Sequence, residues 1–213
     1  MLSVFLIIIY VISIFLITLT FQRFNNNNKE LLRKIIHIGI GPLIPIAKYI
    51  GINQNTAQYV AGFIFLLVFI NYIYKLFPII EDVDRKSYGT LFYCLSFFTL
   101  ISLFWDKEPE SLIVGCFIMA FGDGFAGLIG KSFKSRSWKV FNQKKSLLGT
   151  STMFLISFSI ILIMSFISNY QFTFNYILLA LIATCLEQFS FIGIDNLIVP
   201  TISAFLYSYL IAI

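Results

Sequence analysis

The chain consists almost entirely of apolar runs about 20 residues long, separated by short polar segments. A helix needs about 20 mostly apolar residues to cross the hydrocarbon core of a bilayer. Hydrophobic residues fill 59% of the 213 positions and charged residues only 12%, whereas a soluble domain carries about 25%. The sequence therefore predicts an all-α, polytopic integral-membrane bundle. We expect one domain over residues 1–213, in which the helices themselves build any active site.

About eight spans are expected, with seven as the alternative. Their expected bounds are 3–21, 33–50, 56–74, 88–104, 111–130, 147–168, 173–193 and 196–213. We expect the first run to be a retained span because no basic residue precedes it and no small-residue cleavage site follows it, as would be typical of a signal peptide.

Basic residues alternate between the loops of this eight-span arrangement. The intervening loops contain only Lys48 and Lys107. The loops after the first, third and fifth spans hold Arg23, Lys29, Arg33 and Lys34; Lys75, Arg85 and Lys86; and Lys131, Lys134, Arg136, Lys139, Lys144 and Lys145. The positive-inside rule assigns these loops to the cytosol and both termini to the opposite side, a pattern that seven spans would break. The net charge of +5 is explained in this way, and no nucleic-acid partner is expected.

Asp123 interrupts the fifth apolar run in the segment Phe121–Gly127. A carboxylate within a span is costly unless it faces a polar cavity, a partner or a cation. Gly122, Ala126 and Gly130 recur every four residues, which is typical of a face that packs closely on another helix. Close packing explains the small residues but not the acid, so Asp123 is a candidate functional residue.

Lys144, Lys145 and Ser146 stand directly before the sixth span. Ser146 can cap that helix, and a helix N-terminus beside lysines attracts phosphate. An interfacial anchor with an ordinary serine cap is an equally good interpretation of this segment alone. The nearby Gly130-Lys131-Ser132 does not fit a P-loop, because Phe125 stands where that loop requires glycine.

Further ionisable residues lie at the same ends of other spans. Glu187 falls within the seventh apolar run, where an ionisable residue is a functional-site hypothesis by default. Asp195 precedes the eighth span and could simply cap it. His37 begins the second span, and Arg85 and Lys86 precede the fourth, where they could be interfacial anchors.

All of these candidate residues fall on the predicted cytosolic side of the membrane, so they could belong to one site. This side combines carboxylates, which suit Mg²⁺, with lysine and arginine, which suit phosphate. Phosphoryl transfer from a nucleotide requires that combination, since charge on the transferring group must be neutralised. A transporter is the alternative from another class, although its site would be expected near the bilayer midplane.

Taken in order, these motifs resemble the family of dolichol kinase, phytol kinase and CTP-dependent diacylglycerol kinase. The resemblance runs over most of the chain. It rests on Arg33-Lys34 with His37; on Arg85-Lys86-Ser87-Tyr88-Gly89-Thr90; on Gly122-Asp123, Ala126 and Gly130, followed by Lys145-Ser146 and Gly149-Thr150; and on Glu187 with Gly193, Asp195-Asn196-Leu197 and Pro200. The chain departs from the family pattern at Leu148, where glutamate is common, and at Thr150, where serine is common.

The resemblance implies a kinase that phosphorylates a membrane lipid alcohol such as phytol, a polyprenol or dolichol, or diacylglycerol. CTP is the implied donor, another nucleoside triphosphate being possible, and Mg²⁺ or another divalent cation is the implied cofactor. The implied metal ligands are Asp123 and Glu187, the catalytic residues Asp123, Lys145, Asp195 and His37, and the nucleotide-binding residues Arg85, Lys86, Lys144, Lys145, Ser146, Gly149 and Asn196. Either Asp195 or His37 would accept the hydroxyl proton. Nucleotidyl transfer of the phosphatidate cytidylyltransferase kind is a further alternative.

Overall fold

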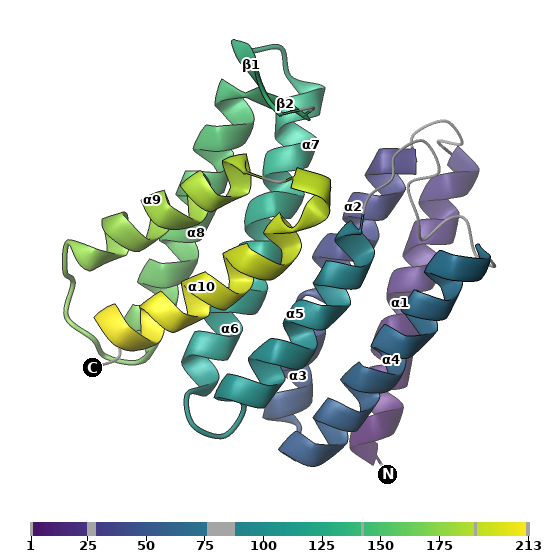
Figure 1. Cartoon of the computed structure of the whole chain (residues 1–213). Coiled ribbons are helices and arrows are strands. Elements are labelled where there is room, and N and C mark those ends of the chain that lie inside the picture. The colour runs from purple at the N-terminus through teal and green to yellow at the C-terminus, as the bar shows by residue number, and fades with distance from the viewer. Residues whose placement is uncertain (1, 25–28, 76–87, 142, 190, 212–213) are drawn as a thin grey trace.

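The chain folds into a bundle of helices with a short β-hairpin at one end, in which most helices run up and down and α9 and α10 lie obliquely to them (Figure 1). A computed structural model describes residues 2–24, 29–75, 88–141, 143–189 and 191–211. Its elements in chain order are α1 (Leu2–Phe24), α2 (Lys29–Ile40), α3 (Leu43–Tyr49), α4 (Gln54–Tyr74), α5 (Gly89–Phe104), α6 (Pro109–Phe117), the π-helical segment η2 (Ile118–Asp123), α7 (Gly124–Ser132), β1 (Ser137–Val140), β2 (Gln143–Ser146), α8 (Leu147–Ile167), α9 (Asn175–Gln188), the 3-10 turn η3 (Phe191–Gly193) and α10 (Asp195–Leu210).

The expected class, an all-α membrane protein, is confirmed. Within the described ranges, four helical stretches are long and apolar enough to cross a membrane: Ser3–Arg23, Gln54–Tyr74, Pro109–Ser132 and Leu147–Ile167. Gly89–Phe104 and Asn175–Gln188 are shorter apolar helices. Each of the eight expected spans thus corresponds to one helix or to two or three successive helical segments.

The second expected span, 33–50, is not one continuous helix. It divides into α2 and α3 at Gly41 and Pro42. Proline cannot donate a backbone hydrogen bond and its ring clashes with the preceding turn, which ends α2. A Cβ at Gly41 would lie 2.1 Å from Cβ of Ala120, so glycine lets the chain pass very close to η2 at this break.

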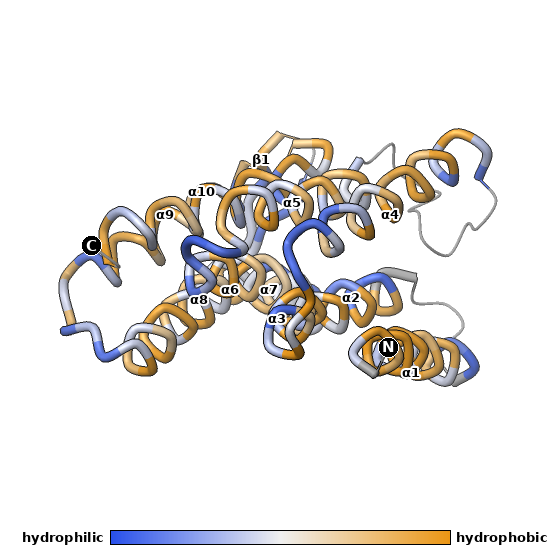
Figure 2. The backbone as a smooth tube through the Cα atoms, turned by 90° about the horizontal axis from the view of Figure 1, so that it is seen from below, coloured by the Kyte–Doolittle hydropathy of each residue, from blue (hydrophilic) through white to orange (hydrophobic). Residues whose placement is uncertain are grey.

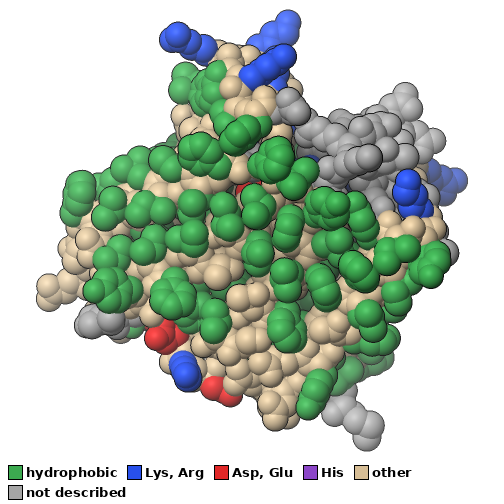
Figure 3. All heavy atoms as spheres, viewed as in Figure 1, with side chains coloured by type: hydrophobic (Ala, Val, Ile, Leu, Met, Phe, Trp, Pro, Cys, Tyr) green, Lys and Arg blue, Asp and Glu red, His purple; other side chains and the backbone are tan. Residues whose placement is uncertain are grey.

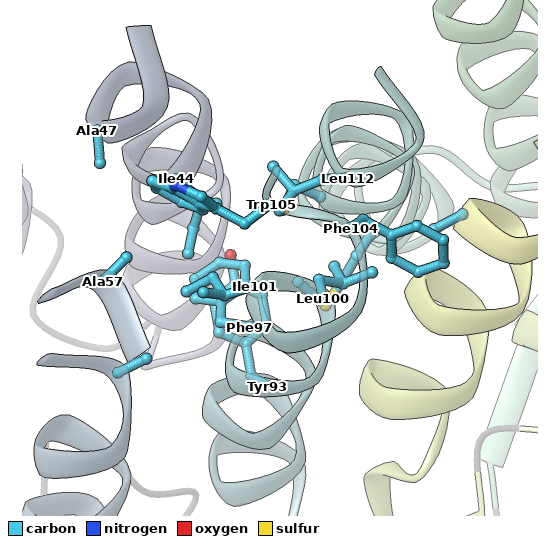
Figure 4. Close-up of a cluster of buried hydrophobic side chains, with 14 residues drawn as sticks. Ile44, Ala47, Ala57, Tyr93, Phe97, Leu100, Ile101, Phe104, Trp105 and Leu112 are labelled. Carbon is cyan, nitrogen blue, oxygen red and sulfur yellow. The ribbon is translucent and has the colours of Figure 1, made fainter. Parts of the chain in front are cut away.

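The helices form two layers (Figure 2). In one layer the neighbouring helices follow the order α4, α5, α10, α9. In the other they follow the order α1, α2, then α6 with α7, then α8. Hydrophobic side chains fill the space on both sides of α6. One cluster includes Phe97, Ile101 and Trp105 (Figure 4), and a second lies among α8, α9 and α10 around Val114 and Ile118. The run from α6 to α7 is therefore the central element of the bundle.

The outer surface is that of a membrane protein with one strongly basic end. Hydrophobic side chains cover the middle of the face in Figure 3, and Lys and Arg project at the end that carries the hairpin. Seen from the opposite end, hydrophilic residues gather in the connections (Figure 2). We call the end that contains the hairpin the basic end. The end of α1, the end of α4 and the hairpin lie toward it, whereas the start of α1 and the end of α10 point away from it (Figure 1).

This arrangement predicts that both termini lie on the membrane side opposite to the hairpin. In sealed vesicles, reporter tags at the N- and C-termini should both be accessible from the same side of the membrane. A single cysteine introduced as Lys139→Cys, in a background without the three native cysteines, should react with an impermeant reagent only from the opposite side. A terminus accessible from the same side as position 139 would show that the number of spans is wrong.

Candidate active site

The carboxylate of Asp123 is paired with a lysine from α2. Asp123 ends the π-helical segment η2, a wide kind of helical turn that is frequently found at functional sites. The ammonium of Lys34 lies 2.7 Å from Asp123 Oδ2 and also donates to the Asp123 backbone carbonyl at 3.1 Å. The exposed fraction is only 6% for the Lys34 side chain and 16% for that of Asp123. A nearly buried ammonium requires such a partner, so the pair fixes α2 against η2.

His37 supports the same carboxylate from the next position on that face of α2, three residues after Lys34. Its Nε2 lies 3.3 Å from Asp123 Oδ2 and 3.1 Å from the Met119 carbonyl oxygen. Because a carbonyl can only accept, Nε2 must carry the proton in this arrangement. The Tyr93 hydroxyl donates to the His37 carbonyl at 2.7 Å, and the two rings are 4.3 Å apart. Nε2 of His37 therefore donates to the Met119 carbonyl beside Asp123 and is not available as a base.

A glycine provides the space for the Lys34 side chain. A Cβ placed on Gly127 would lie 2.7 Å from Cε and 3.0 Å from Nζ of Lys34. The first distance is shorter than real contacts and the second is very tight, so a side chain at position 127 would push the end of the Lys34 side chain aside. The Lys34 side chain thus fills the space that the missing side chain of Gly127 leaves beside Asp123.

A second lysine–carboxylate pair joins the hairpin to α9. Strands β1 and β2 are antiparallel, with Lys145 opposite Trp138 and Lys144 opposite Lys139. Successive residues of a strand point to opposite sides, so Lys144 is exposed whereas Lys145 turns into the bundle. The ammonium of Lys145 donates to the carboxylate of Glu187, and to its backbone carbonyl at 2.8 Å. Both side chains are at most 10% exposed.

The other carboxylate oxygen of Glu187 is held by its neighbour in the chain. Gln188 Nε2 donates to Glu187 Oε2 at 2.9 Å and to the Thr150 hydroxyl at 3.0 Å. The amide thereby links Glu187 in α9 to the first turn of α8. The sequence did not predict a role for Gln188 or for Lys34. For Lys34, its position three residues before His37 could have indicated that both side chains lie on the same face of the helix.

Ser146 and Gly149 determine how α8 begins. The Gly149 N–H donates to the Ser146 hydroxyl at 3.2 Å, which confirms the expected serine cap. A Cβ on Gly149 would lie 3.3 Å from Cα of Gly130 and 2.9 Å from the Ala126 carbonyl, so α7 and α8 cross in very close contact here. These contacts give both residues a structural part, and their expected part in binding phosphate stays a prediction.

Asn196 ties the α9–α10 turn to the start of α5. Its Nδ2 donates to the Gly89 carbonyl at 3.0 Å, and the Tyr88 N–H donates to the Ile192 carbonyl at the same distance. The last residues of the Arg85–Thr90 motif, Tyr88 and Gly89, are thus held next to the α9–α10 turn. Arg85 and Lys86 themselves lie outside the described residues.

Asp195 completes the charged cluster at the first turn of α10. Its Oδ1 is buried and has no hydrogen-bond partner among the residues that the structure describes. The charges of Asp123, Lys145, Glu187 and Lys34 all act on it, and the charge of Lys145 also acts on Asp123. The two ion pairs and Asp195 therefore form one electrostatic unit, which we call the charge cluster. It joins the two layers of the bundle toward the basic end.

Within the described residues, no group of three or more His, Cys, Asp or Glu side chains is already arranged to hold a metal ion. In place of a cation, Asp123 and Glu187 each have a lysine as partner. The type of donor nevertheless suits a hard cation, because Mg²⁺ and Ca²⁺ are bound by carboxylate oxygens, and Asp123, Glu187 and Asp195 lie close enough to influence one another electrostatically.

Comparison with known proteins establishes the family. The chain is 37% identical over 190 residues to the phytol kinase of Synechocystis sp., a match that covers 86% of this chain and 80% of that protein. The chain belongs to the phytol kinase family. This agrees with the resemblance seen in the sequence, and it confirms the expected class of enzyme, a kinase with a lipid alcohol as acceptor.

Plant members of the family are more distant. Phytol kinase 1, chloroplastic, of Arabidopsis thaliana is 29% identical over 159 residues, which are 68% of this chain and 52% of that protein. Probable phytol kinase 2, chloroplastic, of Glycine max is 32% identical over 131 residues, which are 61% of this chain and 44% of that protein. The chain thus spans about half the length of these plant relatives. No family model and no solved structure matches the chain.

The crowding at Gly127 leads to a prediction for Gly127→Ala. The added methyl group meets only the flexible end of Lys34, so the fold should be retained while the ammonium moves away from Asp123. We expect kinase activity to fall at least about tenfold, the effect of losing roughly 1.4 kcal/mol of stabilisation at the site. Gly62→Ala is the matched control, since its Cβ would meet Phe98 at an ordinary 3.7 Å. Equal activity of the two variants in a lipid kinase assay would contradict a functional Lys34–Asp123 pair.

Proposed function

We propose that this chain transfers a phosphoryl group from a nucleoside triphosphate, CTP in particular, to the hydroxyl of a membrane lipid alcohol. Phytol is the first choice of acceptor, ahead of a polyprenol, dolichol or diacylglycerol. The observation that carries the proposal is the charge cluster, in which lysines and carboxylates from both layers meet at one end of the bundle. The relationship to the phytol kinase of Synechocystis supports phytol as the acceptor. In this proposal the basic end faces the cytosol, where the nucleotide is available.

Asp123 and Glu187 are the proposed ligands of a divalent cation, Mg²⁺ in the first place. Bound Mg²⁺ would neutralise charge on the donor phosphates. To take part, each carboxylate must exchange its lysine for the cation. The exchange releases the ammonium groups of Lys34 and Lys145 within the same cluster, where phosphate oxygens can become their new partners.

Lys145 is the best placed of the basic residues to bind the donor. It immediately precedes Ser146, the N-cap of α8, so a phosphate bound by its ammonium would also be close to the free N–H groups of that helix. Lys144 is exposed on the other side of the hairpin and would act at longer range. Arg85 is proposed to neutralise further phosphate oxygens.

Asp195 is the proposed acceptor of the proton from the alcohol. Its Oδ1 is buried without a hydrogen-bond partner among the described residues, so a lone pair is free to accept a substrate hydroxyl. Nε2 of His37 already carries a proton, which it donates to the Met119 carbonyl beside Asp123. His37 is therefore proposed as a positioning residue. A loose phosphoryl-transfer transition state does not require a strong base, so correct placement of the hydroxyl is the main contribution of Asp195.

A direct product assay tests the proposal. Purified protein is incubated with Mg²⁺, one of several alcohols, namely phytol, a polyprenol and diacylglycerol, and CTP or ATP. The nucleotide is labelled at the γ-phosphate in one series and at the α-phosphate in a second, since phosphoryl transfer moves the first label to the lipid and nucleotidyl transfer moves the second. We expect labelled phytyl phosphate with CTP, and none from Asp123→Asn, which keeps the shape of the side chain but removes its charge. Labelled nucleotide joined to the lipid would indicate nucleotidyl transfer instead, and absence of any lipid product with the whole panel would reject the proposal.

The hairpin offers a test of the nucleotide site itself. Lys145→Ala should lower activity steeply and raise the KM for the nucleotide, because it removes the ammonium that meets Glu187. Lys134→Ala removes the same charge from an exposed position of the same connection and should retain most of the activity. Both are compared at matched membrane expression and across nucleotide concentrations. Equal kinetics for the two variants would reduce Lys145 to a topological anchor.

A further inference from the structure

Six large apolar side chains are exposed around the turn between α9 and α10. Their exposed fractions range from 36% to 62%. The turn contributes Phe189, Phe191, Ile192 and Ile194, the hairpin contributes Phe141, and the residue before α5 contributes Tyr88. We call this set the turn patch. The rings of Phe141 and Phe191 are 5.6 Å apart, so residues 50 positions apart in the sequence form a continuous surface.

The position of the turn patch distinguishes it from the ordinary lipid-facing surface of the bundle. The turn begins just after Glu187 and ends at Asp195, so the patch is bounded in sequence by two carboxylates of the charge cluster. On the face shown in Figure 3, a small area of carboxylate is visible below the hairpin, surrounded by hydrophobic side chains. An apolar surface and a buried acidic site are therefore adjacent here.

The backbone of the turn is held in an unusual conformation. Ile192 has φ 48°, a region in which a β-branched residue is a genuine outlier, and the following Gly193 has φ 89°. The carbonyl of Ile192 accepts the N–H of Tyr88 at 3.0 Å, which fixes the turn to the start of α5. A glycine at position 192 would be free of strain, yet an exposed isoleucine side chain stands there. Strained backbone of this kind is found at functional sites.

We infer that the turn patch is the surface on which the hydrocarbon chain of the lipid alcohol lies, with its hydroxyl end directed to Asp195. This inference rests on the proposed function. An isoprenoid alcohol is a long apolar chain with one polar end, and the structure provides an exposed apolar surface that leads to a buried, unpartnered carboxylate oxygen among the described residues. The substrate then reaches the charge cluster laterally, from the membrane side of the α9–α10 turn.

The two ring residues provide the test. Phe191→Ala and Phe141→Ala each remove an exposed ring from the patch, and Phe166→Ala removes a ring that is 82% exposed at the far end of α8. For the patch variants we expect the KM for phytol to rise about tenfold, the loss from one large apolar contact, with kcat and the KM for CTP within about twofold of the parent protein. Phe191→Leu should restore most of the affinity. The KM for the short alcohol prenol should barely change, and Phe166→Ala should behave like the parent.

Other results would overturn the inference. A rise in the KM for CTP with an unchanged KM for phytol would mean that the rings stack on the nucleotide base. Kinetics equal to those of Phe166→Ala would mean that the patch has no contact with substrate, and a fall in kcat and thermal stability alone would mean that the rings only support the fold. Cross-linking of a photoreactive isoprenoid alcohol to residues 189–194 tests lipid binding to the patch without requiring catalysis. If the parent protein proves to be inactive, that result therefore counts against the proposed function, whereas the cross-linking still decides whether the patch binds the lipid.

Discussion

The interaction on which the site depends is the pairing of buried lysines with buried carboxylates. In a bilayer there is little water to solvate a lone charge, and removing one partner of a buried pair typically destabilises a protein by about 3–5 kcal/mol. Lys34 can meet Asp123 only if α2 lies against η2, and Lys145 can meet Glu187 only if the hairpin reaches α9. Since apolar helix faces pack in many orientations, these two pairs select one arrangement of the helices at the basic end.

Close backbone contacts make this arrangement possible. Gly130 and Gly149 bring α7 and α8 together just below the hairpin, which places β2 and Lys145 at the edge of the bundle. On the other side of the central helix, a Cβ at Gly115 would lie 2.6 Å from the carbonyl of Pro200, so α6 and α10 also touch through backbone. Small residues at such crossings are typical of membrane helices, where van der Waals contact replaces the hydrophobic effect as the main attraction.

Much of this architecture could be predicted from the sequence because it depends on local composition. Apolar runs gave the helices, and basic loops predicted that Asp123, Lys145, Glu187 and Asp195 would fall toward one end. The pairing could not be predicted, because Lys34 and Asp123 are 89 residues apart and either lysine could have met either carboxylate. The break between α2 and α3 could have been predicted from Pro42. The π-helical turn that ends at Asp123 and the register of the hairpin could not, because they depend on tertiary contacts that no local sequence pattern encodes.

The paired state of the charge cluster also bears on the order in which substrates bind in the proposed reaction. A cation alone would leave a displaced lysine buried beside it, and a nucleotide alone would face carboxylates that no longer have a partner. Both situations leave uncompensated charge in a poorly solvated place, which is costly. A cation and a triphosphate that arrive together can replace both partners at once, so that every charge keeps an opposite neighbour. A site built from internal ion pairs should therefore favour the metal–nucleotide complex over either component.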